Sequence, residues 1–191
     1  MDIASVLAVA FLAAAVRAEV PPVGGSKAVA PPGKAYTVYT DISPERCKTV
    51  EESPEYDYVL RSCPGVGGYS LQTVHGDERD SITVISPDGQ EYPLDYSPVV
   101  AGAFSSLGAK AEWRVKDVRG KPVPVALIAR LTVSIETEAG HKTRSYLAVA
   151  KIMPDEVCVT DRIEPSKDQN EKARIAADSA ADKPCMKEAQ R

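Results

Sequence analysis

Hydrophobic and polar residues alternate along the middle of the chain with the period of two that is typical of β-strands. In the clearest run, Leu127, Leu131 and Ile135 share one face, whereas Arg130 and Ser134 lie on the other. The predicted strands span residues 56–61, 69–75, 80–85, 91–94, 112–118, 127–135, 144–153 and 156–161.

Short segments rich in turn-forming residues join these strands, among them Gly76-Asp77-Glu78, Pro87-Asp88-Gly89 and Arg119-Gly120-Lys121-Pro122. Strands joined by tight turns pair antiparallel. We therefore expect a mainly β fold, in which an antiparallel meander forms a sandwich or a partly open barrel. The strand at 144–153 is expected to be central, and the strand at 156–161 is expected to form an edge.

Near the end of the chain the period changes to that of a helix. Ser166 and Gln169 have the spacing of a capping box, which predicts one α-helix packed on the sheet, from about residue 166 to residue 183. Alanines recur on one face of this helix, at Ala173, Ala176, Ala177 and Ala180. Because alanines bury little area, we expect the helix to depend on a covalent link to the sheet.

The first eighteen residues predict a signal peptide, and we expect cleavage after Ala18. An apolar run from Ile3 to Val16 leads into Val16-Arg17-Ala18, which fits a signal-peptidase site. The run is too short to cross a hydrocarbon core of roughly 30 Å as a helix, so no stable membrane insertion is expected after cleavage. Residues 19–34, rich in Pro and Gly, predict a flexible tether, and residues 35–191 predict a single domain.

The four cysteines are Cys47, Cys63, Cys158 and Cys185. An even number in an exported chain indicates two disulfides, for which three pairings are possible. We favour Cys47–Cys63 and Cys158–Cys185, because each pair encloses a local segment and the second would hold the helix against the sheet. Each closure is expected to stabilise the fold by roughly 3 kcal/mol. A zinc site is disfavoured, since no two cysteines have the spacing of metal ligands.

Two segments are candidates for a surface that contacts another protein. Residues 95–110 are apolar yet rich in Gly, Ser and Pro, which predicts either a packed crossover loop or an exposed loop. The other segment is an acidic loop between the first two cysteines. The candidate contact residues are Val99, Phe104 and Leu107 in the first segment and Glu51, Glu52 and Glu55 in the second. Phe104 is either the anchor of such a contact or a core residue that caps the sheet, and the pattern favours the core role.

The sequence contains no recognisable catalytic, metal-binding or nucleotide-binding motif, and no cofactor is expected. His75 precedes a turn that contains two carboxylates and could act as a base, but a histidine at such a place is more often a solvated surface residue. Trp113, the only tryptophan, is expected in the core. The net charge of −4 provides no basic surface for nucleic acid.

Several motifs resemble a family of small exported bacterial proteins of unknown function. They are C-x-x-x-E-E-S-P-E-Y-x-Y from Cys47, C-P-G-x-G-G-Y from Cys63, G-A-F-S-S-L-G-x-x-A-E-W-R from Gly102 and the terminal N-E-K-A-R-I-A-A-D. This resemblance covers nearly all of the mature chain and implies no activity. The chain is also similar, more distantly, to periplasmic lysozyme inhibitors, which are small disulfide-bonded β domains. Their C-type family carries an S-G-x-Y loop, whereas Gly68-Tyr69-Ser70 has a different order.

These observations favour a non-catalytic binding protein of the periplasm or the extracellular space, whose partner is another envelope protein. A lysozyme-inhibitor-like protein is one alternative, and a structural or assembly factor of the envelope is another. A third is a hydrolase whose acid and base carboxylates converge from separated segments. Convergence of several polar side chains in a deep pocket would favour the enzyme, whereas an exposed apolar loop would favour partner binding.

Overall fold

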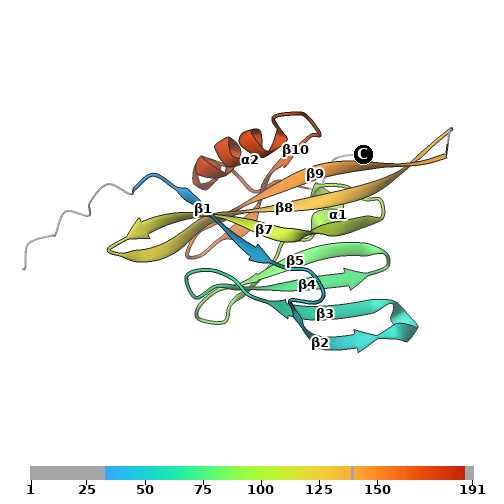
Figure 1. Ribbon diagram of the computed structural model, residues 1–191, viewed down its shortest axis with the longest axis horizontal. Helices are drawn as coiled ribbons and strands as arrows, with labels where there is room; N and C mark the ends of the chain where they lie inside the picture. Colours follow the sequence, from blue (N-terminus) through green and yellow to red (C-terminus); the bar gives the residue numbers. More distant parts are fainter. Residues whose placement is uncertain (1–32, 139, 188–191) are drawn as a thin grey trace, which may run out of the picture. The chain divides into compact units, whose positions relative to one another are not determined.

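A computed structural model of the protein describes residues 33–138 and 140–187 (Figure 1). The predicted signal peptide (1–18) and nearly all of the predicted tether (19–34) lie outside the described residues. The strands are β1 (Tyr36–Asp41), β2 (Lys48–Ser53), β3 (Tyr58–Cys63), β4 (Ser70–Gly76), β5 (Arg79–Ile85), β6 (Glu91–Pro93), β7 (Ser105–Val118), β8 (Lys121–Thr137), β9 (Gly140–Ile152) and β10 (Val157–Ile163). The helices are η1 (Pro54–Tyr56), α1 (Tyr96–Val99), α2 (Gln169–Asp178) and η2 (Ala180–Asp182).

Within the described residues the strands form one mostly antiparallel sheet, in the order β10-β9-β8-β7-β5-β4-β3-β2. In addition, β1 pairs with β7 and β6 pairs with β5. The predicted antiparallel meander is confirmed within β2–β5 and within β7–β10, where each strand pairs with the next. The two runs meet where Arg79 of β5 and Ser105 of β7 form a parallel pair. As predicted, β9 is internal and β10 forms an edge.

The two runs of strands bury a common core, so the packing is sandwich-like. Leu71 and Ile82, from β4 and β5, belong to the same buried cluster as Leu127 from β8. Trp113 of β7 is fully buried in this cluster, which confirms its predicted core position. Its indole Nε1 donates a hydrogen bond to Thr40 Oγ1 of β1 at 2.9 Å, so the polar edge of the ring is also satisfied.

Helix α2 covers the opposite face of β8 and β9 (Figure 1). Its alanine stripe is buried as predicted, against Ala126, Ile128, Leu147 and Val149 of the two strands. The helix is shorter than expected, because it ends at Asp178 and continues as the 3-10 turn η2. Small side chains on the helix allow it to lie close to the strands that it covers.

The predicted capping box is wrong. Ser166 does not cap α2, whose first residue is Gln169. The Gln169 side-chain amide donates hydrogen bonds to the carbonyl oxygens of Ser145, at 2.7 Å, and Ile163, at 3.0 Å. β10 ends at Ile163, two residues before Pro165, which has no amide hydrogen to donate to a neighbouring strand. Gln169 therefore satisfies backbone groups where β10 ends, rather than the start of its own helix.

Both disulfides form as predicted, Cys47–Cys63 and Cys158–Cys185, and no cysteine is free. The first joins the residue that precedes β2 to the last residue of β3. The second joins β10 to the segment that follows η2. Each bridge is local in sequence, with separations of 16 and 27 residues.

Two predicted loops turn out to be regular structure. Glu51 and Glu52 lie in β2, paired with Leu60 and Val59 of β3, so the predicted acidic loop is largely a hairpin. The predicted 95–110 loop contains the helical turn α1, and β7 begins within it at Ser105. In the part of the chain that the structure describes, no helix is long and apolar enough to cross a membrane.

Candidate functional site

The structure separates the predicted contact residues into two regions. The acidic residues Glu51, Glu52 and Glu55 are exposed, on β2 at one end of the strand order and on the adjoining η1. The apolar residues belong instead to the segment before and into β7. Val99 and Leu107 are partly buried and pack against the core. The preference for Phe104 as a core residue is wrong, since 48% of this residue is exposed.

Phe104 lies in a surface cavity of about 400 Å³, which we call the Phe104 groove. The groove is formed by Arg79, Ala103, Phe104, Ile135, Glu136 and His141. Ala103, Phe104 and Ile135 contribute apolar side chains, and we call the charged or titratable lining groups, Arg79, Glu136 and His141, its rim. Apolar side chains combined with polar ones are usual in a protein-binding surface.

The backbone around Phe104 is held on both sides. The Ser134 amide donates a hydrogen bond to the Phe104 carbonyl at 2.8 Å, and the amide of the next residue, Ser105, donates to Glu78 at 3.0 Å. The Arg79 guanidinium lies 5.2 Å from the centre of the Phe104 ring, within the range of a cation–π contact. Arg79 is in turn bonded to Asp77. Phe104 therefore projects from a fixed position.

Beside the groove, β8 and β9 extend beyond the rest of the sheet as a two-stranded arm. The pairing of β8 with β7 ends at Val133, and the pairing of β9 with β10 ends at Leu147. Beyond these residues the described parts of β8 and β9 pair with each other as far as Thr137 and Gly140, and the Ser134 amide also bonds Phe104. Ile135 and His141 belong to this arm, so one wall of the groove is built by an element with exposed edges.

A second cavity, of about 170 Å³, lies against β3, β4 and β5; we call it the His75 cavity. Its walls include Ile42, Arg61, Thr73, His75, Asp80 and Leu107. Strand register places the polar members together, because Arg61 is paired with Thr73 and His75 is paired with Asp80. Residues 73 and 75 lie on the same face of β4, since side chains alternate along a strand.

His75 is held between two carboxylates and is not the solvated surface residue that the sequence favoured. Its Nδ1 lies 2.6 Å from Asp80 Oδ1, and its Nε2 lies 3.4 Å from Asp57 Oδ2. The hydrogen bond to Asp80 raises the pKa of His75, and the charges of Asp80 and Asp57 raise it further, whereas partial burial lowers it. Asp80 Oδ2 also accepts a hydrogen bond from the Leu107 amide at 2.7 Å.

The tight turn between β4 and β5 is the sequence signal that could have predicted that His75 lies opposite Asp80. Asp77 and Glu78 both have positive φ angles, of 50° and 53°, as a two-residue hairpin turn requires. A two-residue turn after Gly76 places residue 75 opposite residue 80. In this arrangement both ring nitrogens face carboxylates, so neither is free to take a proton from a substrate.

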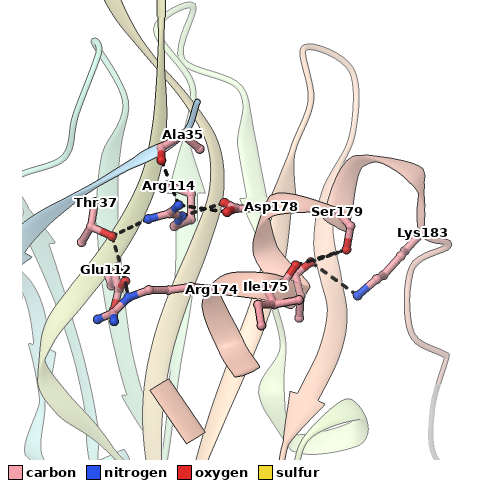
Figure 2. A network of polar contacts seen from close by, with 10 residues as sticks. Ala35, Thr37, Glu112, Arg114, Arg174, Ile175, Asp178, Ser179 and Lys183 are labelled. Atoms are coloured by element: carbon pink, nitrogen blue, oxygen red, sulfur yellow. Dashed lines mark hydrogen bonds and ion pairs between the residues drawn. The ribbon is translucent and has the colours of Figure 1, made fainter. Parts of the chain in front are cut away.

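A third polar cluster fastens α2 to the sheet (Figure 2). Arg174 donates to Glu112 of β7, and Arg114 of β7 donates to Asp178. Glu112 and Arg114 are both buried, although the alternation of β7 places them on the face away from Trp113. The hydrogen bond to Glu112 raises the pKa of Arg174. Each of these four charged side chains is paired with one of opposite charge, which indicates that the cluster serves to hold α2 on the sheet.

In the described part of the chain, one set of side chains has the spacing of metal ligands: Glu156, Cys158 and Cys185. Both sulfur atoms are joined in a disulfide. A cysteine binds a metal as a thiolate, so the oxidised protein offers no metal site with these residues.

Comparison with protein-family models, with curated proteins and with solved structures finds no match for the chain. The resemblances to an exported bacterial family and to lysozyme inhibitors therefore stay predictions. The Phe104 groove and the His75 cavity are the features of the described residues that bear on function.

Proposed function

We propose that the protein is a non-catalytic binding protein of the periplasm or the extracellular space, and that it contacts another envelope protein through the Phe104 groove. The observation that carries this proposal is the half-exposed ring of Phe104, fixed over an apolar cavity with a charged rim. Single exposed apolar residues are common on protein surfaces and need no explanation. Phe104 differs because Ile135 and Ala103 line the same cavity.

A fixed aromatic side chain is well suited to anchor a partner. Binding costs about 0.5–1.5 kcal/mol for each rotamer-rich side chain that must be immobilised, and the contact of the Phe104 ring with Arg79 reduces this cost. Aromatic anchors at the centre of an interface commonly contribute most of the binding energy. The charged rim formed by Arg79, Glu136 and His141 would then select the partner through complementary charges.

The cysteines support the location that we propose. All four form disulfides, and disulfides persist in oxidising compartments rather than in the reducing cytosol. Together with the predicted signal peptide, this favours export to the periplasm or secretion. The tether predicted at 19–34 would give the domain freedom to reach a partner.

The proposal is tested by capturing partners from an envelope extract with immobilised mature protein and with its Phe104→Ala variant. Tyr56→Ala is the matched control, because Tyr56 is an aromatic residue that is 73% exposed and lies on η1, outside the groove. We expect the same partner with the wild type and Tyr56→Ala, and its loss with Phe104→Ala. The melting temperature of Phe104→Ala should change little, because the ring is half-exposed.

A photo-crosslinking residue in place of His141, on the rim of the groove, gives a second measurement on the intact protein. We expect it to crosslink the captured partner, and the crosslink should disappear when Phe104→Ala is added. Capture that is equal for the wild type and Phe104→Ala would contradict the proposal, as would crosslinking from position 141 that persists when Phe104→Ala is added.

The acidic hairpin supports a second candidate, a lysozyme-inhibitor-like activity. Glu51 and Glu52 of β2 and Glu55 of η1 are all exposed, and a disulfide fixes the hairpin that carries them. An acidic surface of this kind would suit a basic enzyme. A lysozyme activity assay with the mature protein and with the triple variant Glu51→Gln, Glu52→Gln, Glu55→Gln tests it. Inhibition by the wild type alone would favour this candidate over the Phe104 groove.

A further inference from the structure

Arg61 of β3 is a partly buried cation in the wall of the His75 cavity. Among the described residues no carboxylate forms an ion pair with it, although such pairs hold Arg79, Arg114, Arg162 and Arg174. Arginine that is withdrawn from solvent is normally paired. Arg61 lines the cavity, and its guanidinium forms no hydrogen bond with the described residues, so its donors are available to a ligand that enters the cavity.

The side chains of Asp80, His75 and Ser43, which also line the cavity, already have hydrogen-bond partners. Asp80 binds His75 through one oxygen and the Leu107 amide through the other. The Ser43 hydroxyl donates to Asp41 at 2.7 Å. Thr73, which is paired with Arg61 in the sheet, contacts only the Cys63 sulfur, at 3.8 Å. Among the described residues the Arg61 guanidinium thus has no hydrogen-bond partner, and the Thr73 hydroxyl has only a long, weak contact with a disulfide sulfur, which a carboxylate oxygen could replace.

We propose that the His75 cavity binds a small carboxylate ligand, held by the Arg61 guanidinium and the Thr73 hydroxyl. The planar fork of an arginine matches the two oxygens of a carboxylate and can form two parallel hydrogen bonds with it. This site lies apart from the Phe104 groove and goes beyond the proposed binding of an envelope protein.

The size and charge of the cavity define the ligand. A volume of about 170 Å³ corresponds to roughly five water molecules, which suits a small acid and excludes a folded partner. Asp80 lies in the same wall, so a ligand with two negative charges would be repelled more strongly than a singly charged one. A monocarboxylate therefore fits better than a phosphate. Ile42 and Leu107 provide apolar contact for its hydrocarbon part.

The test is a titration of the isotope-labelled mature protein with sodium acetate at pH 6.5, followed by NMR at ionic strength kept constant with sodium chloride. We expect a saturable shift of the Arg61 Nε–H signal, together with the amide signals of Thr73 and Leu107. Arg61→Gln should weaken acetate binding at least roughly tenfold, which corresponds to the loss of a charge-assisted bidentate contact. Arg46→Gln, which removes an exposed arginine near Asp41, should change it less than about twofold.

A parallel titration with inorganic phosphate separates the two kinds of oxyanion. Tighter binding of phosphate than of acetate would overturn the assignment of a carboxylate. An Arg61 Nε–H signal that does not shift with acetate would overturn the site itself, and this measurement needs no variant. If Arg61→Gln does not fold, Arg61→Lys keeps the charge but lacks the fork, and unchanged acetate affinity in that variant would also overturn the proposal. None of these three results depends on the outcome of the Phe104 capture experiment.

Discussion

Arg174 of α2 and Glu112 of β7 form an ion pair, with 2.5 Å between Nε and Oε1. The same carboxylate accepts hydrogen bonds from Thr37 and Tyr39 of β1, both at 3.1 Å. One buried side chain thus joins three elements that are far apart in the sequence (Figure 2). A buried carboxylate requires such partners, because burial of an unpaired charge is very costly.

We expect Glu112→Gln to lower the free energy of unfolding by about 2 kcal/mol, because it leaves Arg174 without its counter-charge while water still reaches the guanidinium. Urea denaturation measures this change. Asp168→Asn is the control, since it breaks an exposed i,i+4 pair with Lys172 and should lower the free energy of unfolding much less than Glu112→Gln does. Equal losses for the two variants would contradict a special role of Glu112.

The second prediction concerns the dependence of stability on pH. Because the pKa of His75 is raised in the folded protein, its contribution to stability is fully present below the unfolded pKa, roughly 6.5. The contribution is lost as the pH rises through the folded-state pKa. A neutral imidazole donates from only one nitrogen, so Asp57 or Asp80 then loses its hydrogen bond.

The measurement is urea denaturation of the wild type and of His75→Gln at pH 5.5 and at pH 8.5. We expect the wild type to exceed the variant in stability by more at pH 5.5 than at pH 8.5. Comparison within one pH cancels the titration of the other groups. A difference that stays constant, or that grows with pH, would show that the two carboxylates do not stabilise the protonated ring.

The third prediction concerns the disulfide between Cys158 and Cys185. Loss of this bridge in the double variant Cys158→Ser, Cys185→Ser should raise hydrogen exchange most in residues 180–187. Helix α2 should be affected less, because Arg174 and Arg114 still hold it. Hydrogen exchange followed by mass spectrometry resolves the two segments. A larger increase in α2 than in residues 180–187 would mean that the ion pairs contribute little.

The fourth prediction concerns export and processing. Protein recovered from the envelope or the medium should begin at Glu19, and its mass should be lower by four hydrogens than that of the reduced chain. Intact-mass measurement with and without a reducing agent tests both expectations. Recovery of the full-length chain with free thiols from the cytoplasm would contradict export.

The strands that the sequence predicted correctly have at least one face of hydrophobic residues in the core. In β8 this face includes Leu127 and Leu131, and the alternation stays visible in the sequence because Arg130, on the other face, is only partly buried. β1 and β2 were missed because neither has a well-buried face. All but the last residue of β2 is exposed, so burial left no pattern in its sequence. Tertiary pairing, rather than local pattern, makes it a strand.

The sites were harder to predict than the strands. Phe104 resembles a core residue in the sequence because it is a large apolar residue in a segment with Val99, Val100 and Leu107, yet 48% of it is exposed, and no local pattern distinguishes it from the buried Val100. The paired charges of α2 were also not predictable, because Glu112 and Arg174 are distant in the sequence. The disulfides were predicted correctly, since short loops restrict which cysteines can meet.

The local pairing of the cysteines has a consequence for biogenesis. A chain that is delivered to an oxidising compartment with its N-terminus first presents Cys47 and Cys63 before Cys158 arrives. Oxidation in order of arrival then joins the first two cysteines, and only the correct partners remain for the second bridge. Sequential oxidation therefore gives the native connectivity without the reshuffling of mispaired intermediates, and maturation should not require a disulfide isomerase.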